Sequence, residues 1–127
     1  MAQILIIIQV IAMNWYITKI VFAITHEDNQ AKEQFDEQLR LIAAEDQEEA
    51  FLKARTIGLG EEDCFYNDKN KQVKWEFINV SEVTPLNHLE DGAELYSRIH
   101  ETKAGADYIH FVHQKAIDIR LNACLSY

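Results

Sequence analysis

The sequence predicts an α+β fold: a single domain with a mostly antiparallel β-sheet of four to five strands and two helices packed on it. Several short runs alternate apolar and polar residues, which is the period of a strand with one buried face. Two longer runs repeat apolar residues at helical spacing. Along the chain these runs give the order β-β-α-β-β-β-α, and such consecutive strands favour antiparallel pairing.

The length of the chain, 127 residues, is typical of one domain. Hydrophobic residues make up 48% of it, an ordinary content for a globular protein. A chain of this size buries about two thirds of its unfolded surface, enough for a core without disulfides or metal. We therefore expect one α+β domain over residues 14–127, preceded by an apolar extension over residues 1–13.

The extension begins with MAQILIIIQVIA and has three interpretations. No lysine or arginine precedes Lys19, which argues against a secretory signal. A membrane-spanning helix of about twenty residues would include Lys19, at a cost on the order of 3 kcal/mol. The stretch is thus a dispensable segment upstream of a start at Met13, an extra strand or helix on the core, or a membrane anchor.

The first predicted strand, residues 14–25, carries apolar residues on both faces. Trp15, Ile17 and Val21 share one face, and Tyr16 and Phe22 share the other. This pattern is typical of a central strand covered on each side, or of an edge that pairs with another chain. The polar, acidic residues 26–36 then predict a solvated connection.

The next strand runs directly into a helix. Leu39, Leu41 and Ala43 alternate with Gln38, Arg40 and Ile42, so we expect them to form the buried face of the strand. Asp46 is the expected N-cap of the helix, with Glu49 three residues later as in a capping box. The helix is expected to stop at Gly58, and the apolar residues at helical spacing before it are Ala50, Phe51, Ala54 and Ile57.

A hairpin is predicted next. Residues 64–66 and 72–80 form its strands, and four turn-forming residues, 67–70, connect them. Val73, Trp75 and Phe77 alternate with charged residues and are expected to point inward. Pro85 ends this section, and the alternation over residues 93–100 predicts a further strand.

The last element is a helix after the break at residues 104–106, with Asp107 as its expected cap. His110 and His113 stand at i,i+3 on it, a spacing that presents two imidazoles to a metal if His100 or Glu101 adds a third ligand. The plainer interpretation is two histidines flanking an apolar stripe, because no carboxylate that would orient the imidazoles accompanies them in the sequence. We expect no metal site.

Four segments together resemble one small, mainly bacterial family: WYITKIVFAI, FDEQLRLIAAEDQEEAFLKARTIG, VKWEFINVSEV and LEDGAELYSRI. The family is known as domain of unknown function 4288, and the similarity covers residues 15–99. The resemblance implies a shared architecture and supports Met13 as the start of the chain. It implies no activity, cofactor or catalytic residue.

The net charge of −9 is unevenly distributed, with eleven acidic and four basic residues over residues 27–62. An acidic surface repels phosphate backbones and anionic lipid headgroups, so we expect neither nucleic-acid nor membrane binding. A protein partner with a basic surface fits this charge, although solubility alone also explains it.

Cofactor and thiol chemistry find little support in the sequence. Its four glycines form no nucleotide-binding motif, and no GxSxG elbow is present, so we expect no cofactor and no catalytic residue. Cys64 and Cys124 are far apart and form no CxxC pattern. They are read as two reduced thiols of a cytoplasmic protein, the alternative being one long-range disulfide in a secreted one.

Six residues form the predicted ligand or partner surface: Trp15, Glu37, Trp75, Asp91, Glu94 and Tyr96. The acidic residues around Gly92 suit a cation site or an acid–base pair, or simply a turn before a strand. Glu37 shares the parity of Leu39 and therefore points to the core side or sits at the solvated rim. The aromatic residues line a shallow pocket or belong to the core.

Two functions follow from these observations. The first is a small cytoplasmic protein-interaction module, of which antitoxin-like or immunity-like neutralisation of a basic surface is one form. The alternative is a small-ligand-binding or enzymatic domain that uses the acidic and aromatic residues named above. A symmetric homodimer, formed through an apolar edge or the amino-terminal stretch, is compatible with either.

Overall fold

The computed structural model describes residues 13–28 and 33–125. The three interpretations of residues 1–12 lie outside the described residues. The chain divides into two compact units, one ending at Tyr96 and the other beginning at Ser97, and each is described by itself.

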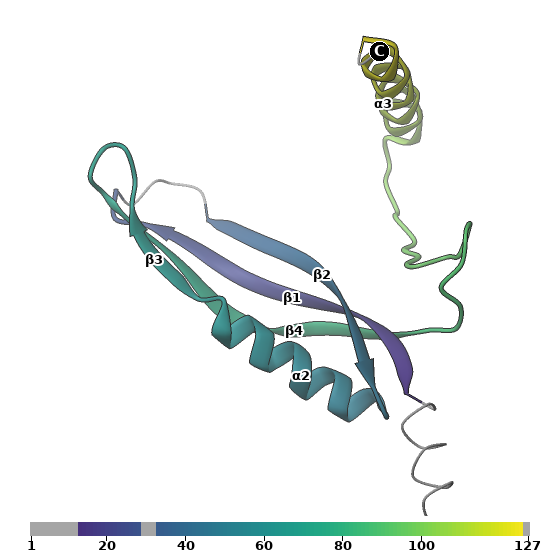
Figure 1. Cartoon of the computed structure of the whole chain (residues 1–127). Helices are drawn as coiled ribbons and strands as arrows, with labels where there is room; N and C mark the ends of the chain where they lie inside the picture. Colours follow the sequence, from purple (N-terminus) through teal and green to yellow (C-terminus); the bar gives the residue numbers. More distant parts are fainter. Residues whose placement is uncertain (1–12, 29–32, 126–127) are drawn as a thin grey trace, which may run out of the picture. The chain divides into compact units, whose positions relative to one another are not determined.

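The first unit is a four-stranded antiparallel sheet with one helix (Figure 1). Its elements are β1 (Asn14–His26), β2 (Gln34–Ala44), α2 (Gln47–Gly60), β3 (Asp63–Tyr66) and β4 (Gln72–Leu86). The strand order is β2-β1-β4-β3, so β1 is a central strand, one of the two expectations for it. The α+β class predicted from the sequence is confirmed.

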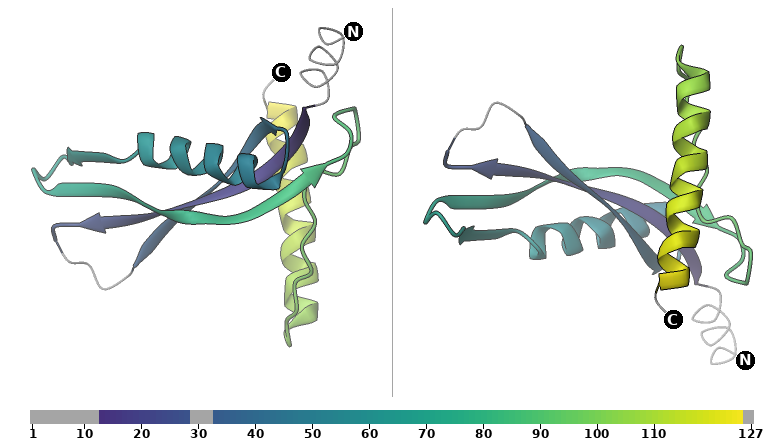
Figure 2. Two further views of the ribbon diagram at one scale, coloured as in Figure 1. Left: turned by 90° about the horizontal axis from the view of Figure 1, so that it is seen from below. Right: turned by 90° about the horizontal axis from the view of Figure 1, so that it is seen from above.

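The core lies between the sheet and α2, which runs along one face of the sheet (Figure 2). Even-numbered residues of β1 point to this face because strand side chains alternate. Ile20 and Phe22 are almost fully buried there and pack against Ala50 and Ala54 of α2. Thr18 is also buried, and its hydroxyl donates to the backbone oxygen of Arg40 at 3.1 Å.

The two faces of β2 are reversed relative to the prediction. Leu39 and Leu41, expected to be buried, are 52% and 44% exposed, whereas Ile42 and Ala44 are buried under α2. The reason is the register with β1: Ile42 is directly opposite Tyr16, on the helix face, and Leu41 is opposite Ile17, on the other face. The more apolar side of β2 therefore points away from the helix.

Helix α2 begins as the sequence predicts and ends two residues later. The Asp46 carboxylate accepts from the Glu49 backbone N–H at 2.8 Å, and the Glu49 carboxylate accepts from the Glu45 N–H at 3.1 Å. Gly58 is not the stop, because the helix continues to Gly60. Gly58 instead allows close packing: a Cβ there would lie 2.4 Å from the Phe77 ring.

Strands β3 and β4 form the predicted hairpin, with Phe65 opposite Val73. Asn70 adopts a left-handed conformation (φ 60°) in its turn. Val73 is buried, and Trp75 and Phe77 pack against the core, which confirms their inward direction. Two register shifts in the β1–β4 pairing bring Val80 and Val83 to the same helix face later in the strand.

The segment after β4 contains a turn and no regular strand. Ala93 N–H donates to the Glu90 backbone oxygen at 3.0 Å, and Gly92 has φ +86°, a conformation that favours glycine. The turn expected around Gly92 is therefore present. The strand expected over residues 93–100 is wrong, since this segment pairs with no strand of the sheet.

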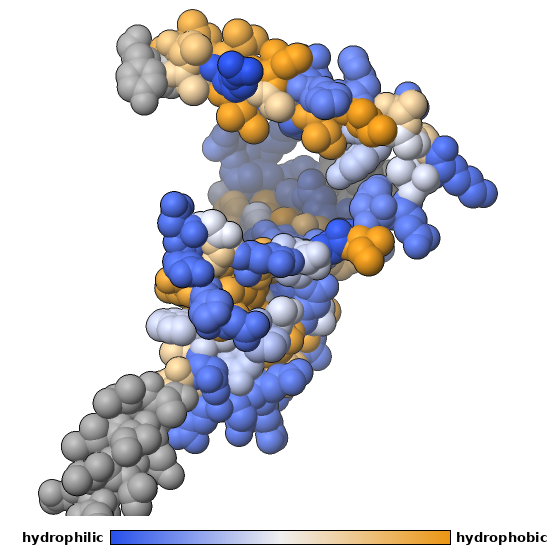
Figure 3. All heavy atoms as spheres, turned by 90° about the vertical axis from the view of Figure 1, so that its right-hand side faces the viewer, coloured by the Kyte–Doolittle hydropathy of each residue, from blue (hydrophilic) through white to orange (hydrophobic). Residues whose placement is uncertain are grey.

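The second unit contains helix α3 (Gly105–Leu125). The helix begins at Gly105, so Asp107 belongs to its first turn and is not its cap. None of its described residues is buried, and apolar side chains are exposed along it (Figure 3). A stacked pair formed by His100 and Tyr108, with ring centroids 5.0 Å apart, connects the helix to the segment before it.

Candidate protein-binding surface

The face of the sheet opposite α2 is the candidate site, and we call it the open face. It contains the odd-numbered residues of β1 and β2, because directly paired residues in an antiparallel sheet share a face. The same pairing adds part of β4. Its members are Trp15, Ile17, Lys19, Val21, Ala23, Thr25, Phe35, Glu37, Leu39, Leu41, Ala43, Lys74, Glu76, Asn79, Glu82, Thr84 and Leu86.

Large apolar side chains remain exposed on the open face. Trp15 is 42% exposed and Phe35 is 57% exposed, and both lie on the same side as Leu39 and Leu41. Single exposed apolar residues are ordinary, but a contiguous group marks a binding surface more often than chance. Trp15, Leu39 and Leu41 are neighbours on two adjacent strands and form such a group, whereas Glu37 separates Phe35 from Leu39 along β2.

A polar cluster lies beside these apolar residues. The Lys19 amine is 3.6 Å from the Glu82 carboxylate, and the Tyr96 hydroxyl donates to that same carboxylate at 3.3 Å. The amine also lies 5.4 Å from the centre of the Tyr96 ring, within the range of a cation–π contact. The chain that follows β4 thus returns to the open face at Tyr96.

The electrostatics of this cluster hold Lys19 in its charged form. Burial alone lowers the pKa of the Lys19 amine, but Glu82, Tyr96 and Glu37 favour the cation and together raise that pKa above its ordinary value of 10.5. An amine that stays protonated at neutral pH is an anchor for carboxylates and a poor nucleophile. The second carboxylate oxygen of Glu82 is buried without a hydrogen-bond partner within the described residues.

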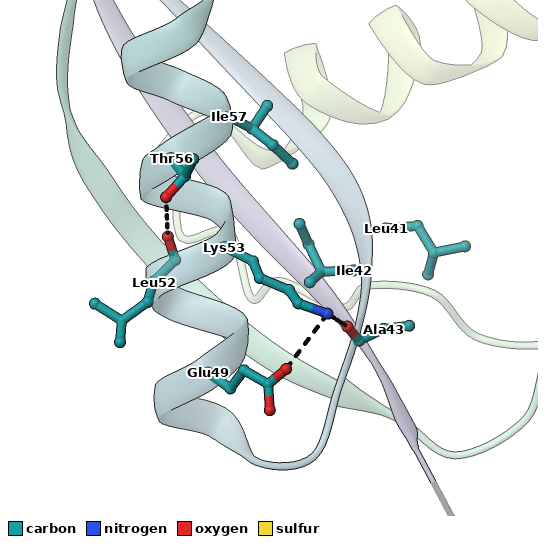
Figure 4. A pocket seen from close by; sticks show the side chains of 8 residues that line it. All are labelled: Leu41, Ile42, Ala43, Glu49, Leu52, Lys53, Thr56 and Ile57. Carbon is teal, nitrogen blue, oxygen red and sulfur yellow. Dashed lines mark hydrogen bonds and ion pairs between the residues drawn. The ribbon is translucent and has the colours of Figure 1, made fainter. Parts of the chain in front are cut away.

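A groove of about 570 Å³ separates α2 from the end of β2 (Figure 4). Its lining is mostly apolar: Leu41, Ile42, Ala43, Leu52, Thr56 and Ile57, together with Glu49 and Lys53. The Lys53 amine donates to the Ala43 backbone oxygen at 2.7 Å and lies 3.4 Å from the Glu49 carboxylate. Lys53 therefore satisfies one of the carbonyl groups at the end of the edge strand.

The structure brings three of the six predicted surface residues to the open face: Trp15, Glu37 and Tyr96. Trp75 is on the helix face, where its indole N–H donates to the Asp36 carboxylate at 3.1 Å. Asp91 and Glu94 are exposed in the segment after β4. Of the three acidic residues that the enzymatic hypothesis combines, Glu37 is the one that belongs to the open face by its pairing.

Glu82 is the site residue that sequence reasoning missed. The available signal was a lysine within a strand that is otherwise apolar on both faces. Such a cation requires an acidic partner when its strand is central, and the pairing of Lys19 with Glu82 across β1 and β4 supplies it.

The described residues bear on the metal, thiol and membrane interpretations of the sequence. They contain no group of three or more histidine, cysteine or acidic side chains placed to hold a metal ion, and His110 and His113 are exposed on α3. Cys64 and Cys124 are both free and exposed. No helix in this part of the chain combines the length and apolarity needed to cross a membrane.

Comparison with known proteins identifies one family. A family model described as a domain of unknown function (DUF4288) matches residues 15–97, which confirms the resemblance seen in the sequence. The match covers the whole sheet and α2 and ends where the second unit begins. No curated protein and no solved structure matches the chain.

Proposed function

The chain belongs to the family described as a domain of unknown function (DUF4288), a description that gives no activity, and we propose that it is a small protein-interaction module. The module acts in the cytoplasm and binds a partner protein through the open face of its sheet. The observation that carries this proposal is the reversed pattern of β2, which directs Leu39 and Leu41 away from the only helix of the sheet unit's described residues.

The reversed pattern is costly unless another surface covers it. A strand that contributes to one core alone normally turns its apolar side chains toward that core. In β2 only Ile42 and Ala44 do so. Instead, Gln38 and Arg40 lie on the helix face and Leu39 and Leu41 on the open face. Apolar contact with a partner protein explains this choice.

The charge of the molecule indicates the chemistry of the partner. The acidic excess over residues 27–62 includes β2, which contributes to the open face, and α2, which lies on the opposite face of the sheet. A partner with apolar residues at its centre and basic residues around them complements this surface, and opposite potentials accelerate such an encounter. Neutralisation of a basic toxin is one form that this activity takes.

Affinity capture from the cells that produce the protein tests the proposal. The wild-type chain is compared with Leu39→Glu on the open face and with Leu59→Glu, a control at a site of α2 that is 48% exposed. We expect one stoichiometric partner with the wild type and the control, and loss of that partner with Leu39→Glu. A partner that is retained by the folded Leu39→Glu variant would contradict the proposal.

A small-ligand-binding domain is the second candidate, favoured by the groove between α2 and β2. Its apolar walls and the Lys53 amine suit a small apolar ligand that carries an anionic group. A thermal-shift screen measures this directly, because a ligand at a hundred times its Kd adds about 2.7 kcal/mol and raises the Tm by roughly 10 °C. Thr56→Trp fills the groove and should abolish any shift.

A further inference from the structure

The outer edge of β2 is a second feature of the sheet that the proposed function does not use. β2 is the first strand in the sheet order, and its eleven residues pair with β1 without a register shift. The strand contains no proline and no bulge, which are devices that protect edges from pairing with another chain. Within the sheet unit of Figure 1, no other described strand lies along this edge.

The backbone groups that face outward along this edge can be assigned. Glu27 N–H donates to the Gln72 oxygen, so odd-numbered residues at this end of β1 face β4 and even-numbered ones face β2. Even-numbered residues of β2 therefore bond to β1, and its odd-numbered residues point their N–H and C=O groups outward. The bond from Lys53 to the Ala43 oxygen agrees, since it reaches an outward carbonyl.

We propose that two copies of this chain pair through their β2 edges, antiparallel about a two-fold axis at Gln38. In this register, residues 35, 37, 39 and 41 of one copy bond to residues 41, 39, 37 and 35 of the other. All outward groups from 35 to 41 are used, and the carbonyl of Ala43 keeps its bond to Lys53. If the two-fold axis lay at residue 39 instead, residue 35 of the second copy would need the Ala43 carbonyl, which already accepts from Lys53.

The side chains favour the same register. Asp36 and Arg40 both lie on the helix face of β2, and a two-fold axis at Gln38 places Asp36 of each copy opposite Arg40 of the other. Within one chain these three residues already form a ladder, in which Gln38 donates to Asp36 at 2.6 Å and accepts from Arg40 at 2.8 Å. The guanidinium of Arg40, which also pairs with Glu61, retains Nη1 for a further carboxylate.

The open face gains apolar contact in the same arrangement. Phe35 of one copy stands opposite Leu41 of the other, and both residues are exposed in the single chain. The two Glu37 carboxylates come near each other across the axis, but each has the Lys19 cation of its own chain nearby. The pairing goes beyond the proposed function, and the two can fail separately. A monomeric chain that still binds a partner through the open face would contradict the pairing and leave the proposed function standing.

Sedimentation of the full chain with exchanged charges tests the pairing. The wild type should sediment at twice the mass of the chain. Asp36→Lys and Arg40→Glu should each sediment as monomers, since each places like charges opposite one another. Their equimolar mixture should restore the dimer, because the introduced charges are then opposite complementary ones. Arg55→Glu, on the exposed side of α2, is the matched control and should remain dimeric.

Cysteine cross-linking fixes the register and does not depend on those variants folding. With Cys64 and Cys124 replaced by serine, Gln38→Cys stands opposite its own copy and should form an intermolecular disulfide under mild oxidation. Gln34→Cys should not, because its opposite residue is Ile42 of the other copy. A wild-type chain that is monomeric at all attainable concentrations would overturn the proposal, as would a dimer that cross-links at Leu39→Cys and not at Gln38→Cys.

Discussion

Gly58 and Lys19 are the residues whose roles depend most on their surroundings. Gly58 lies inside α2, where a glycine costs about 1 kcal/mol relative to alanine in helix propensity. It is retained because the helix approaches β4 and β1 closely there, with the Phe77 ring and the Ile20 side chain occupying the space of a Cβ. Close packing thus outweighs helix propensity at this position.

Gly58→Ala should therefore destabilise the protein, although it improves helix propensity. The new Cβ lies 2.4 Å from the Phe77 ring, and the repacking that relieves such an overlap costs about 1–3 kcal/mol. After the gain in propensity, we expect a net loss of up to about 2 kcal/mol in the free energy of unfolding, measured by urea denaturation. Gly60→Ala is the control, because nothing lies within 4 Å of its Cβ position, and it should be neutral or stabilising.

The Lys19 cluster should make stability depend on pH only in the alkaline range. The folded-state pKa of Lys19 is above 10.5, its ordinary value and therefore its value in the unfolded chain. A raised pKa stabilises the folded state fully below pH 10.5, and this stabilisation is lost as the pH rises through the folded-state pKa.

Thermal unfolding across this pH range measures the contribution. We expect a steeper fall in Tm above pH 10.5 for the wild type than for Lys19→Met, which lacks the titrating amine. Lys74→Met, at an exposed lysine of β4, should follow the wild-type curve. Identical curves for the wild type and Lys19→Met would show that the cluster with Glu82 and Tyr96 contributes nothing.

At the scale of elements, the sequence predicts correctly those structures whose hydrogen bonds form between residues close together in the chain. The Asp46 cap and the turn of the β3–β4 hairpin are of this kind, since their hydrogen bonds form within a few residues. The facing of β2 is not, because its alternation fits either face and only the register with β1 and the position of α2 decide between them.

The same limit applies to the later part of β4 and explains the error over the segment after it. Two register shifts move the inward side chains of β4 from odd to even positions and back. The sequence of β4 alone does not predict where these shifts occur. Residues 93–100 alternate like a strand but have no strand partner, and Tyr96 instead contacts Lys19 and Glu82. The Lys19 cluster was missed for this reason, as its members are distant in sequence.

The exposed face of β2 should tolerate polar substitution. Leu39→Thr together with Leu41→Thr keeps the strand propensity and removes side chains that are about half exposed, so the free energy of unfolding should fall by less than about 1 kcal/mol. Ile42→Ala, at the next position along β2 on the opposite face and 4% exposed, should cost about 2–5 kcal/mol. Denaturant unfolding measures both variants. If the double leucine variant lost as much free energy of unfolding as Ile42→Ala, the leucines would belong to the core and the prediction would be wrong.

At the scale of the whole molecule, the family match and the first unit coincide. The match spans residues 15–97 and the first unit ends at Tyr96, so the sheet, α2 and the returning segment are the part shared with the family. This part carries the open face, the Lys19 cluster and the β2 edge. The proposed binding activity therefore belongs to the shared part, and α3 is a separate feature of this chain.

Side-chain footprinting of the captured complex tests the central claim most directly. Solvent-generated radicals label exposed side chains, and labelling is compared between the free chain and the chain bound to its partner. We predict that Trp15, Phe35, Leu39 and Leu41 lose label in the complex, while Leu59 on α2 keeps it. Loss of label around Leu59, with the open-face residues still labelled, would contradict the assignment of the open face as the binding surface.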